Sequence, residues 1–180
     1  LILCDKDGIL VPGTPGQPSH HEELAARTNP EKRTGTLAEA LVGADVFIGV
    51  SRPGLVTGAM VETMAKDPVI LAMANPVPEI MPDEALAHGA AVVGTGRSDF
   101  PNQINNVLVF PGLFKGALSC GAVQITEGMK YAAAQALADM VAPEDLSPTC
   151  ILPSPLNRAA ADAVANAVAA EARRTGHARF

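Results

Sequence analysis

The sequence predicts an α/β protein in which a doubly wound parallel sheet is followed by C-terminal helices. Short apolar runs bounded by turn residues alternate with helical patterns along the first half of the chain. The runs are continuously apolar, which is typical of parallel strands whose two faces are both covered. The order strand, helix, strand, helix has a doubly wound sheet as its natural product.

Four apolar runs are expected to form the strands. They are residues 1–4, 45–50, 69–74 and 90–94.

The three segments between the later strands are expected to be helices. They read TLAEALVGA from Thr36, TGAMVETMAK after Val56 and PDEALAHG after Met81. Each opens with a capping or first-turn residue, and the first and last close near a glycine.

The C-terminal portion, from about residue 104 to 180, is expected to be helical. NNVLVFPGLFKGALSCGA and ITEGMKYAAAQALADMV indicate two consecutive helices, the first kinked at Pro111 and Gly112. PTCILPSPLN indicates an extended connection, and the alanine-rich segment after it indicates an amphipathic helix that ends at Gly176.

Composition excludes several classes of protein. A net charge of −6 and an aromatic content of 3% argue against nucleic acid as a partner. No apolar run approaches the ~20 residues of a membrane span. The three scattered cysteines indicate reduced thiols in a cytoplasmic protein, and a metal site at His20 and His21 is disfavoured.

The ends of the predicted strands carry the polar candidates for a ligand site, because ligands of open α/β sheets bind beyond the carboxyl ends of the strands. Asp5 follows the first run, and in a Rossmann-like fold a carboxylate there can accept both ribose hydroxyls of an adenosine. The alternative is an aspartate that opens a turn with Gly8. Val50 and Ser51 follow the second run, ahead of a Pro-Gly turn.

Amides and glycines follow the third and fourth runs. Asn75 precedes Pro76, Gly96 permits close backbone approach, and Asn105 and Asn106 stand at the start of the next helix. The two asparagines could serve a ligand or could cap that helix. Together, the four strand ends predict a nucleotide crevice.

The first strand of the sheet is expected to be absent. No GxGxxG motif precedes Asp5, and the chain opens directly in an apolar run at Leu1, as a piece of a longer protein would. Residues 1–4 then correspond to the second strand and 45–50 to the fourth, so we expect either a gap or an abnormal direct pairing between them.

Four segments resemble a known family. GADVFIGVSRPG, MANPVPEIMPDEA, GTGRSDFPNQINNVLVFPGLFKGAL and TGHAR closely resemble the NAD(P)-binding domain of bacterial malic enzymes, from Leu1 to about Arg179. The resemblance implies an NAD(P)-binding domain over residues 1–180. It also implies oxidation of L-malate by NAD or NADP, with decarboxylation to pyruvate and CO2 and a requirement for Mg2+ or Mn2+.

The resemblance also implies roles for the candidate residues. Asp5 would hold the adenosine ribose, Val50 and Ser51 would border the cofactor, and Gly96 would lie along its nicotinamide half. Asn75, Asn105 and Asn106 would reach the nicotinamide ribose, its carboxamide or the malate carboxylates. Asp5 favours NAD, whereas Lys6 beside it could meet the 2′-phosphate of NADP.

The chain lacks other parts of the family's machinery. In malic enzymes the catalytic Tyr and Lys, the acidic metal ligands and the glycine loop come earlier, so no catalytic residue and no metal ligand is expected in this chain. Neither Tyr131 nor Lys115 matches the catalytic motifs. We therefore expect the chain alone to be inactive, to require an N-terminal malic domain and to form a homo-oligomer. The alternatives are a non-catalytic nucleotide-binding or assembly module, and another Rossmann dehydrogenase.

Overall fold

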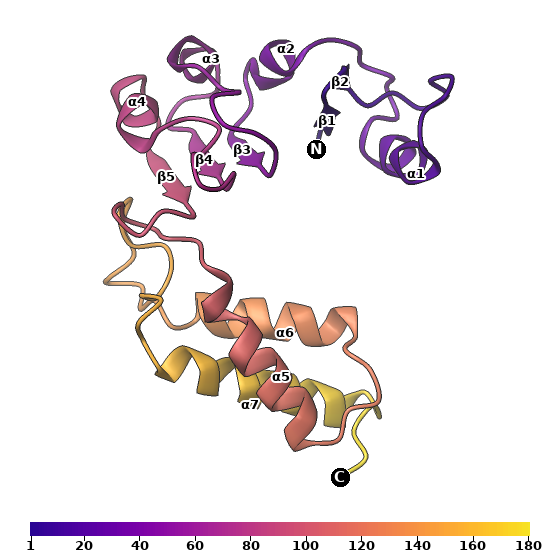
Figure 1. The fold of residues 1–180 in the computed structure, drawn as a ribbon, viewed down its shortest axis with the longest axis vertical. Coiled ribbons are helices and arrows are strands. Elements are labelled where there is room, and N and C mark those ends of the chain that lie inside the picture. The colour runs from indigo at the N-terminus through magenta and orange to yellow at the C-terminus, as the bar shows by residue number, and fades with distance from the viewer.

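The computed structural model describes all 180 residues as an α/β part followed by a helical part (Figure 1). The elements of the α/β part are β1 (Cys4–Asp5), β2 (Gly8–Ile9), α1 (Ser19–Thr28), α2 (Leu37–Leu41), β3 (Val46–Gly49), α3 (Gly58–Glu62), β4 (Val69–Ala72), α4 (Pro82–Ala87) and β5 (Val92–Thr95). Those of the helical part are the 3-10 helix η1 (Asn106–Leu108), α5 (Phe110–Ser119), α6 (Glu127–Ala138) and α7 (Ala159–Arg174).

The predicted Rossmann-like α/β fold is confirmed between residues 36 and 95. Strands β3, β4 and β5 form a parallel sheet in that order, with α3 and α4 as the crossovers. The core between sheet and helices is apolar, and its largest members include Phe47, Val61, Ile70 and Ile80.

The predicted helix starts are confirmed by their caps. The Thr36 hydroxyl accepts from the backbone N–H of Glu39, whose carboxylate in turn accepts from the N–H of Thr36. Thr57 caps α3, and Pro82 occupies the first turn of α4, where its missing N–H costs no hydrogen bond.

Residues 1–4 do not form a parallel strand, so this expectation is wrong. β1 pairs antiparallel with β2, Cys4 opposite Ile9 and Asp5 opposite Gly8. The turn between them closes at Gly8, whose φ of +112° suits glycine. An apolar run identifies a strand but not its partner. Here the partner strand is β2, which follows directly after the turn.

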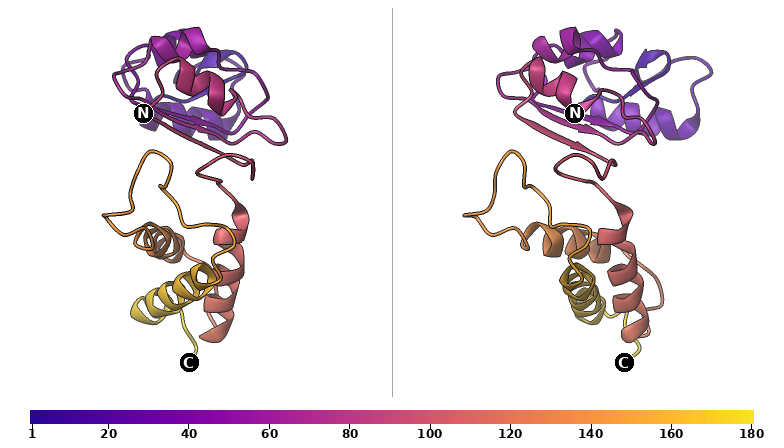
Figure 2. Two further views of the ribbon diagram at one scale, coloured as in Figure 1. Left: turned by 90° about the vertical axis from the view of Figure 1, so that its left-hand side faces the viewer. Right: turned by 60° about the vertical axis from the view of Figure 1, so that its left-hand side comes forward.

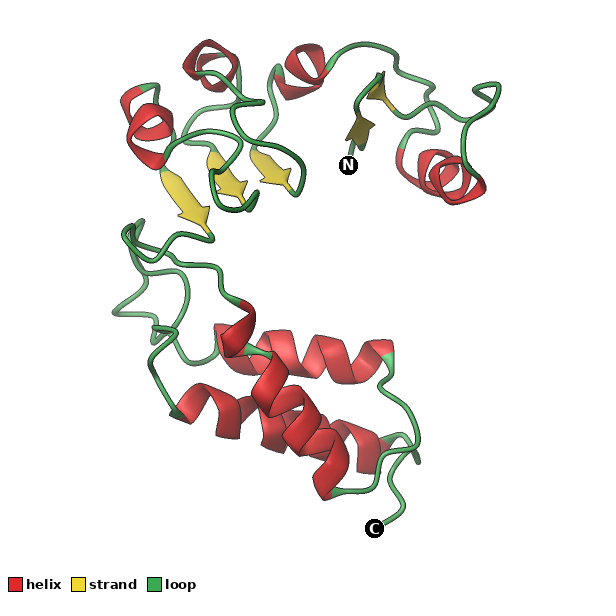
Figure 3. Ribbon diagram, viewed as in Figure 1, coloured by secondary structure: helices red, strands yellow, loops and turns green.

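No strand pairing joins this hairpin to the parallel sheet. Figure 3 shows β1 and β2 lying apart from β3, with no strand between them. Of the two arrangements expected for residues 1–4 and 45–50, the structure has the gap.

One face of β3 is open, although its sequence predicts cover on both faces. Phe47 is buried in the core, whereas Val46 and Ile48 on the opposite face are 49% and 60% exposed. Helices α2, α3 and α4 all lie on the Phe47 face (Figure 2). Consequently this chain alone covers only one side of the sheet at β3.

The helical part has a core of its own, in which α5 and α6 pack against α7. Gly112 and Gly116 permit the closest approach, since a Cβ on Gly116 would lie 2.4 Å from the carbonyl oxygen of Ala165 in α7. Pro111 does not kink this helix as expected. It lies in the first turn of α5, directly after η1, where proline is tolerated.

Helix α1 begins at Ser19, so His20 and His21 lie in its first turn. Its apolar side is short, with only Ala25 fully buried, so the sequence carries little helical periodicity there. None of the helices has the length and apolar character that a membrane crossing requires.

Candidate functional site at the carboxyl edge of the sheet

The carboxyl ends of the three parallel strands lie in one row. Gly49 is aligned with Ala72, and Ala72 with Thr95, so the strands end side by side and point the same way (Figure 3). Val50 and Gly96 directly follow the outer two strands and are exposed. Since register alone fixes this alignment, the sheet brings these predicted residues to one edge.

Ser51 and Asn75 belong to the same edge. Ser51 is the second residue after β3 and Asn75 the third after β4, and both are exposed. The Asn75–Pro76 peptide is cis, and no hydrogen bond within the protein engages the Asn75 side chain. The amide of Asn75 is therefore free to bind a ligand.

Glu79 lies behind this edge, and the sequence reading missed it. Its carboxylate is fully buried and accepts hydrogen bonds from the backbone N–H of Ser51 at 2.7 Å and of Ala74 at 3.0 Å. It makes no ion pair with a basic side chain. The only residue in the sequence that hints at the buried carboxylate is Gly49. In the structure a Cβ at this position would lie 2.5 Å from the Glu79 carboxyl carbon, so only glycine leaves space for it.

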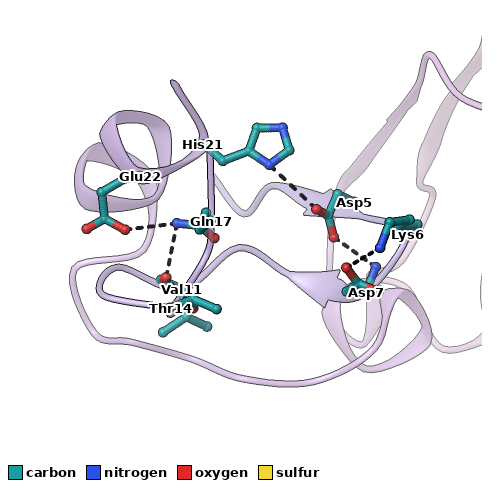
Figure 4. A network of polar contacts seen from close by, with 8 residues as sticks. All are labelled: Asp5, Lys6, Asp7, Val11, Thr14, Gln17, His21 and Glu22. Carbon is teal, nitrogen blue, oxygen red and sulfur yellow. Dashed lines mark hydrogen bonds and ion pairs between the residues drawn. The ribbon is translucent and has the colours of Figure 1, made fainter. Parts of the chain in front are cut away.

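Asp5 stands at the tip of the hairpin rather than at the sheet edge. Its Oδ1 accepts from the N–H of Asp7 at 2.8 Å, which is the turn-forming role given above as the alternative. Its Oδ2 lies 3.5 Å from Nδ1 of His21, and that buried nitrogen has no hydrogen-bond partner (Figure 4). Asp5 therefore contacts both the turn at Asp7 and the ring of His21.

Lys6 is paired within the same turn. Its ammonium donates to Asp7 at 2.5 Å, and this hydrogen bond raises the pKa of Lys6 (Figure 4). The side chain is otherwise exposed. An anion that approached Lys6 would therefore compete with Asp7 for it.

The amides after β5 have different environments. Asn102 is buried and donates to the carbonyl oxygens of Val93 and Pro148, and Gln103 donates to that of Gly96. Asn105 caps η1 by accepting from the N–H of Val107 at 3.0 Å. The Asn106 side chain is exposed and makes no hydrogen bond within the protein, so it is the amide most free to meet a ligand.

Arg97 is neutralised by its neighbour. It donates to both oxygens of Asp99, at 2.9 and 2.6 Å, and these hydrogen bonds lower the pKa of the Asp99 carboxyl. The guanidinium also lies 5.6 Å from the ring centre of Phe100. Arg97 therefore shapes the loop after β5 and offers little free charge to a ligand.

The residues present fit a dinucleotide better than a metal ion. The edge offers backbone, hydroxyl and amide groups, and Asp5 offers an oxygen for a ribose. No group of three or more His, Cys, Asp or Glu side chains is close enough together to hold a metal. Two shallow grooves elsewhere, one between α2 and α3 and one beside Leu1 and Leu24, include none of the predicted site residues.

Proteins of known family resemble this chain along its whole length. Residues 1–173 match the family model for the NAD-binding domain of malic enzyme. The chain is 52% identical to a bifunctional malic/malolactic enzyme of Bacillus subtilis, an alignment that covers 100% of this chain and 44% of that protein. It is 47% identical to an NAD-dependent malic enzyme of Geobacillus stearothermophilus, covering 99% of this chain and 37% of the relative. An NADP-dependent malic enzyme of Rhizobium meliloti is 45% identical, with 99% and 25% covered.

Solved structures agree with these relatives. The malic enzyme of Entamoeba histolytica superposes with a TM-score of 0.91 at 39% identity, covering 99% of this chain and 38% of that one. The malic enzyme of Pyrococcus horikoshii superposes with a TM-score of 0.85 at 47% identity, covering 90% and 37%. The chain thus spans less than half the length of these proteins, and the shared part is the nucleotide-binding one. This chain belongs to the family of malic enzyme NAD-binding domains.

Proposed function

We propose that this chain is the nicotinamide-nucleotide-binding part of a longer malic enzyme. That enzyme would oxidise L-malate with NAD or NADP and decarboxylate the product to pyruvate and CO2. The observation that carries the proposal is the row of aligned strand ends, which presents Val50, Ser51, Asn75 and Gly96 at one edge in a chain of this family.

Each candidate residue has a role in this proposal. Val50 and Ser51 border the dinucleotide, and Gly96 leaves space for its nicotinamide half. Asn75, Asn105 and Asn106 serve the nicotinamide ribose, its carboxamide or the malate carboxylates. An uncharged amide can orient a dianionic substrate without adding a charge that opposes hydride departure. A divalent ion, Mg2+ or Mn2+, would supply an electron sink for decarboxylation, with ligands outside this chain.

We propose that NAD is the preferred cofactor, although relatives with 47% and 45% identity carry names of both kinds, NAD-dependent and NADP-dependent. Oδ2 of Asp5, which lies 3.5 Å from Nδ1 of His21 and accepts no hydrogen bond within the protein, suits a ribose hydroxyl and would repel a 2′-phosphate. Lys6, the cation closest to Asp5 along the chain, is already bonded to Asp7.

The proposal extends to cellular setting and assembly. Three cysteines without disulfides suit a cytoplasmic location. The open face of β3, with Val46 and Ile48, suits cover by further polypeptide, either the N-terminal malic domain or a second subunit of a homo-oligomer.

Steady-state kinetics of the purified full-length enzyme test this function. We expect NADH to form when malate, NAD and Mn2+ are all present, with pyruvate in equal amount and a lower kcat/KM with NADP. Binding of NADH, followed by its fluorescence, is measured in parallel. Binding without turnover would favour the alternative, a non-catalytic nucleotide-binding module, and absence of both would contradict the proposal.

A further inference from the structure

We propose that Glu79 is a positioning residue for the dinucleotide, a role that rests on the proposed function. Its buried carboxylate ties the segment after β3 to the segment after β4. These are the two segments that present Val50 and Ser51 on one side and Asn75 on the other.

Each carboxylate oxygen of Glu79 accepts a hydrogen bond from the segment after a different strand. Oε1 accepts from the N–H of Ser51 at 2.7 Å, and Oε2 accepts from the N–H of Ala74 at 3.0 Å. Val50 precedes the first of these donors and Asn75 follows the second. A single side chain therefore sets the distance between two exposed groups on different strands.

The backbone around Glu79 strengthens the same connection. The carbonyl oxygen of Glu79 accepts from the N–H of Val56 at 3.0 Å, and that of Pro78 accepts from the N–H of Gly54 at 3.2 Å. Residues 78–79 thus hold the segment from Ser51 to Val56 at three points. Side chain and backbone together fix the exit of β3 against the turn after β4.

The charge of Glu79 is more than packing requires. Both oxygens accept backbone hydrogen bonds, and no basic side chain pairs with the group. Burying a carboxylate without a cation is costly, and hydrogen bonds to a charged acceptor are shorter and stronger than neutral ones. A stiff link between two ligand-facing segments is what this arrangement provides.

The absence of a side chain at Gly49 leaves the space that the Glu79 carboxylate occupies. Gly49 ends β3 directly beside Glu79, and a Cβ at this position would lie 2.5 Å from the carboxyl carbon and 2.7 Å from Oε1. The last residue of β3 therefore has to be glycine for the carboxylate to reach Ser51.

The test is the variant Glu79→Gln in the full-length enzyme. Glutamine keeps the length of the side chain, but its NH2 group faces a backbone N–H and one of the two bonds is lost. We expect the KM for NAD, and the Kd for NADH, to rise about tenfold, because the segments after β3 and β4 are no longer tied together and must be ordered when the dinucleotide binds. We expect kcat to change by less than about threefold, because the link orders binding residues and not reacting atoms.

Glu84→Gln is the matched control. Glu84 also accepts a backbone N–H bond, from Gly58 at 3.1 Å, but holds the start of α3 and neither Ser51 nor Ala74. It is expected to lower Tm slightly and to leave the KM for NAD unchanged. If Glu79→Gln also lowers only Tm, with an unchanged KM well below that temperature, the role of Glu79 is structural and the inference is wrong.

Three further measurements separate the possible failures. Wild-type enzyme that binds no dinucleotide would contradict the proposed function and this inference together, whereas normal wild-type binding with an unchanged variant contradicts the inference alone.

If Glu79→Gln does not fold, the variant Glu79→Asp takes its place. Aspartate keeps the charge but is too short to span both donors, and the same rise in the KM for NAD is expected. In the 180-residue chain, amide exchange at Ser51 and Ala74 should be faster in either variant.

Discussion

Four amide side chains follow β5 between residues 102 and 106, and they differ in burial and in hydrogen-bond partners. Asn102 is 7% exposed and makes three hydrogen bonds, two to carbonyl oxygens and one from the N–H of Ile151. Asn106 is exposed and makes none through its side chain. Substitution of these two residues should therefore separate stability from activity.

Asn102→Ala is expected to destabilise the protein. It leaves the buried carbonyl of Val93 without a partner, at about 1–3 kcal/mol for a group that water cannot reach, and it removes two part-buried hydrogen bonds, to Pro148 and from Ile151. It also places alanine at a φ of +55°, where asparagine is better tolerated. We expect the free energy of unfolding to fall by about 2 kcal/mol or more, measured by urea denaturation. A stability equal to that of wild type would show that the loop at residues 148–151 is not held by Asn102.

Asn106→Ala is expected to impair catalysis by the full-length enzyme without loss of stability. One lost hydrogen bond to a charged or strongly polar ligand group costs ~1.5–3 kcal/mol, or roughly ten- to over a hundredfold in kcat/KM for malate. Asn166→Ala, on the exposed side of α7, is the control and should leave both kcat/KM and Tm unchanged. Full activity of Asn106→Ala would leave Asn106 only its place in the first turn of η1.

The exposed candidates can be predicted from the sequence and the buried ones cannot, for a physical reason. Val50, Ser51, Asn75 and Gly96 follow apolar runs, so the local pattern is enough to put them at strand ends. Glu79 and Asn102 act on partners 28 and 46 residues away along the chain, and no local pattern contains that distance. A buried polar side chain is recognised only once the fold supplies its partners.

Among the helices and strands, the sequence pattern of a helix is more predictive than that of a strand. A cap and a helical period are complete within one segment, which is why the starts at Thr36, Thr57 and Pro82 are confirmed. A strand needs a partner from another segment of the chain. The partner of β1 is the adjacent strand β2 and not a strand of the parallel sheet. The run at 45–50 gave the strand correctly but not the open face of Val46 and Ile48.

Gly116→Ala tests the contact between α5 and α7. The added Cβ would lie 2.4 Å from a backbone oxygen and 2.9 Å from the Cβ of Val168, neither of which can move without shifting α7. Overpacking of this kind costs about 1–3 kcal/mol, which calorimetry would register as a lower Tm.

Gly128→Ala, in the first turn of α6, is the control for Gly116→Ala. There the new methyl would meet only the carboxylate end of Glu171, a flexible side chain that can turn aside. Alanine has the higher helix propensity, so Tm should hold or rise slightly. Equal Tm values for the two variants would mean that α5 and α7 pack less closely than the structure shows.

Across the whole chain, the tyrosine and Lys115 lie away from the edge that we propose binds the dinucleotide. The only tyrosine, Tyr131, is exposed on α6, and Lys115 of α5 is paired with Asp162 at 2.6 Å. Both lie in the helical part rather than at the carboxyl ends of the strands. Apart from the paired Arg97 and Asp99, the candidate side chains at that edge are amides and a hydroxyl, which orient a substrate but do not exchange protons near neutral pH.

The 180-residue chain by itself is therefore expected to show no malate-dependent reduction of NAD or NADP, even with Mg2+ or Mn2+. Decarboxylation needs an electron sink, and no cluster of three ligating side chains exists here to hold a metal. Absorbance of the reduced cofactor measures turnover, with the full-length enzyme as positive control. If the remainder of the enzyme, added as a separate polypeptide, restores activity, the missing groups lie in that part. Turnover by the purified chain alone would instead require an acid, a base and a metal site within these residues, and would contradict the assignment of this chain to cofactor binding alone.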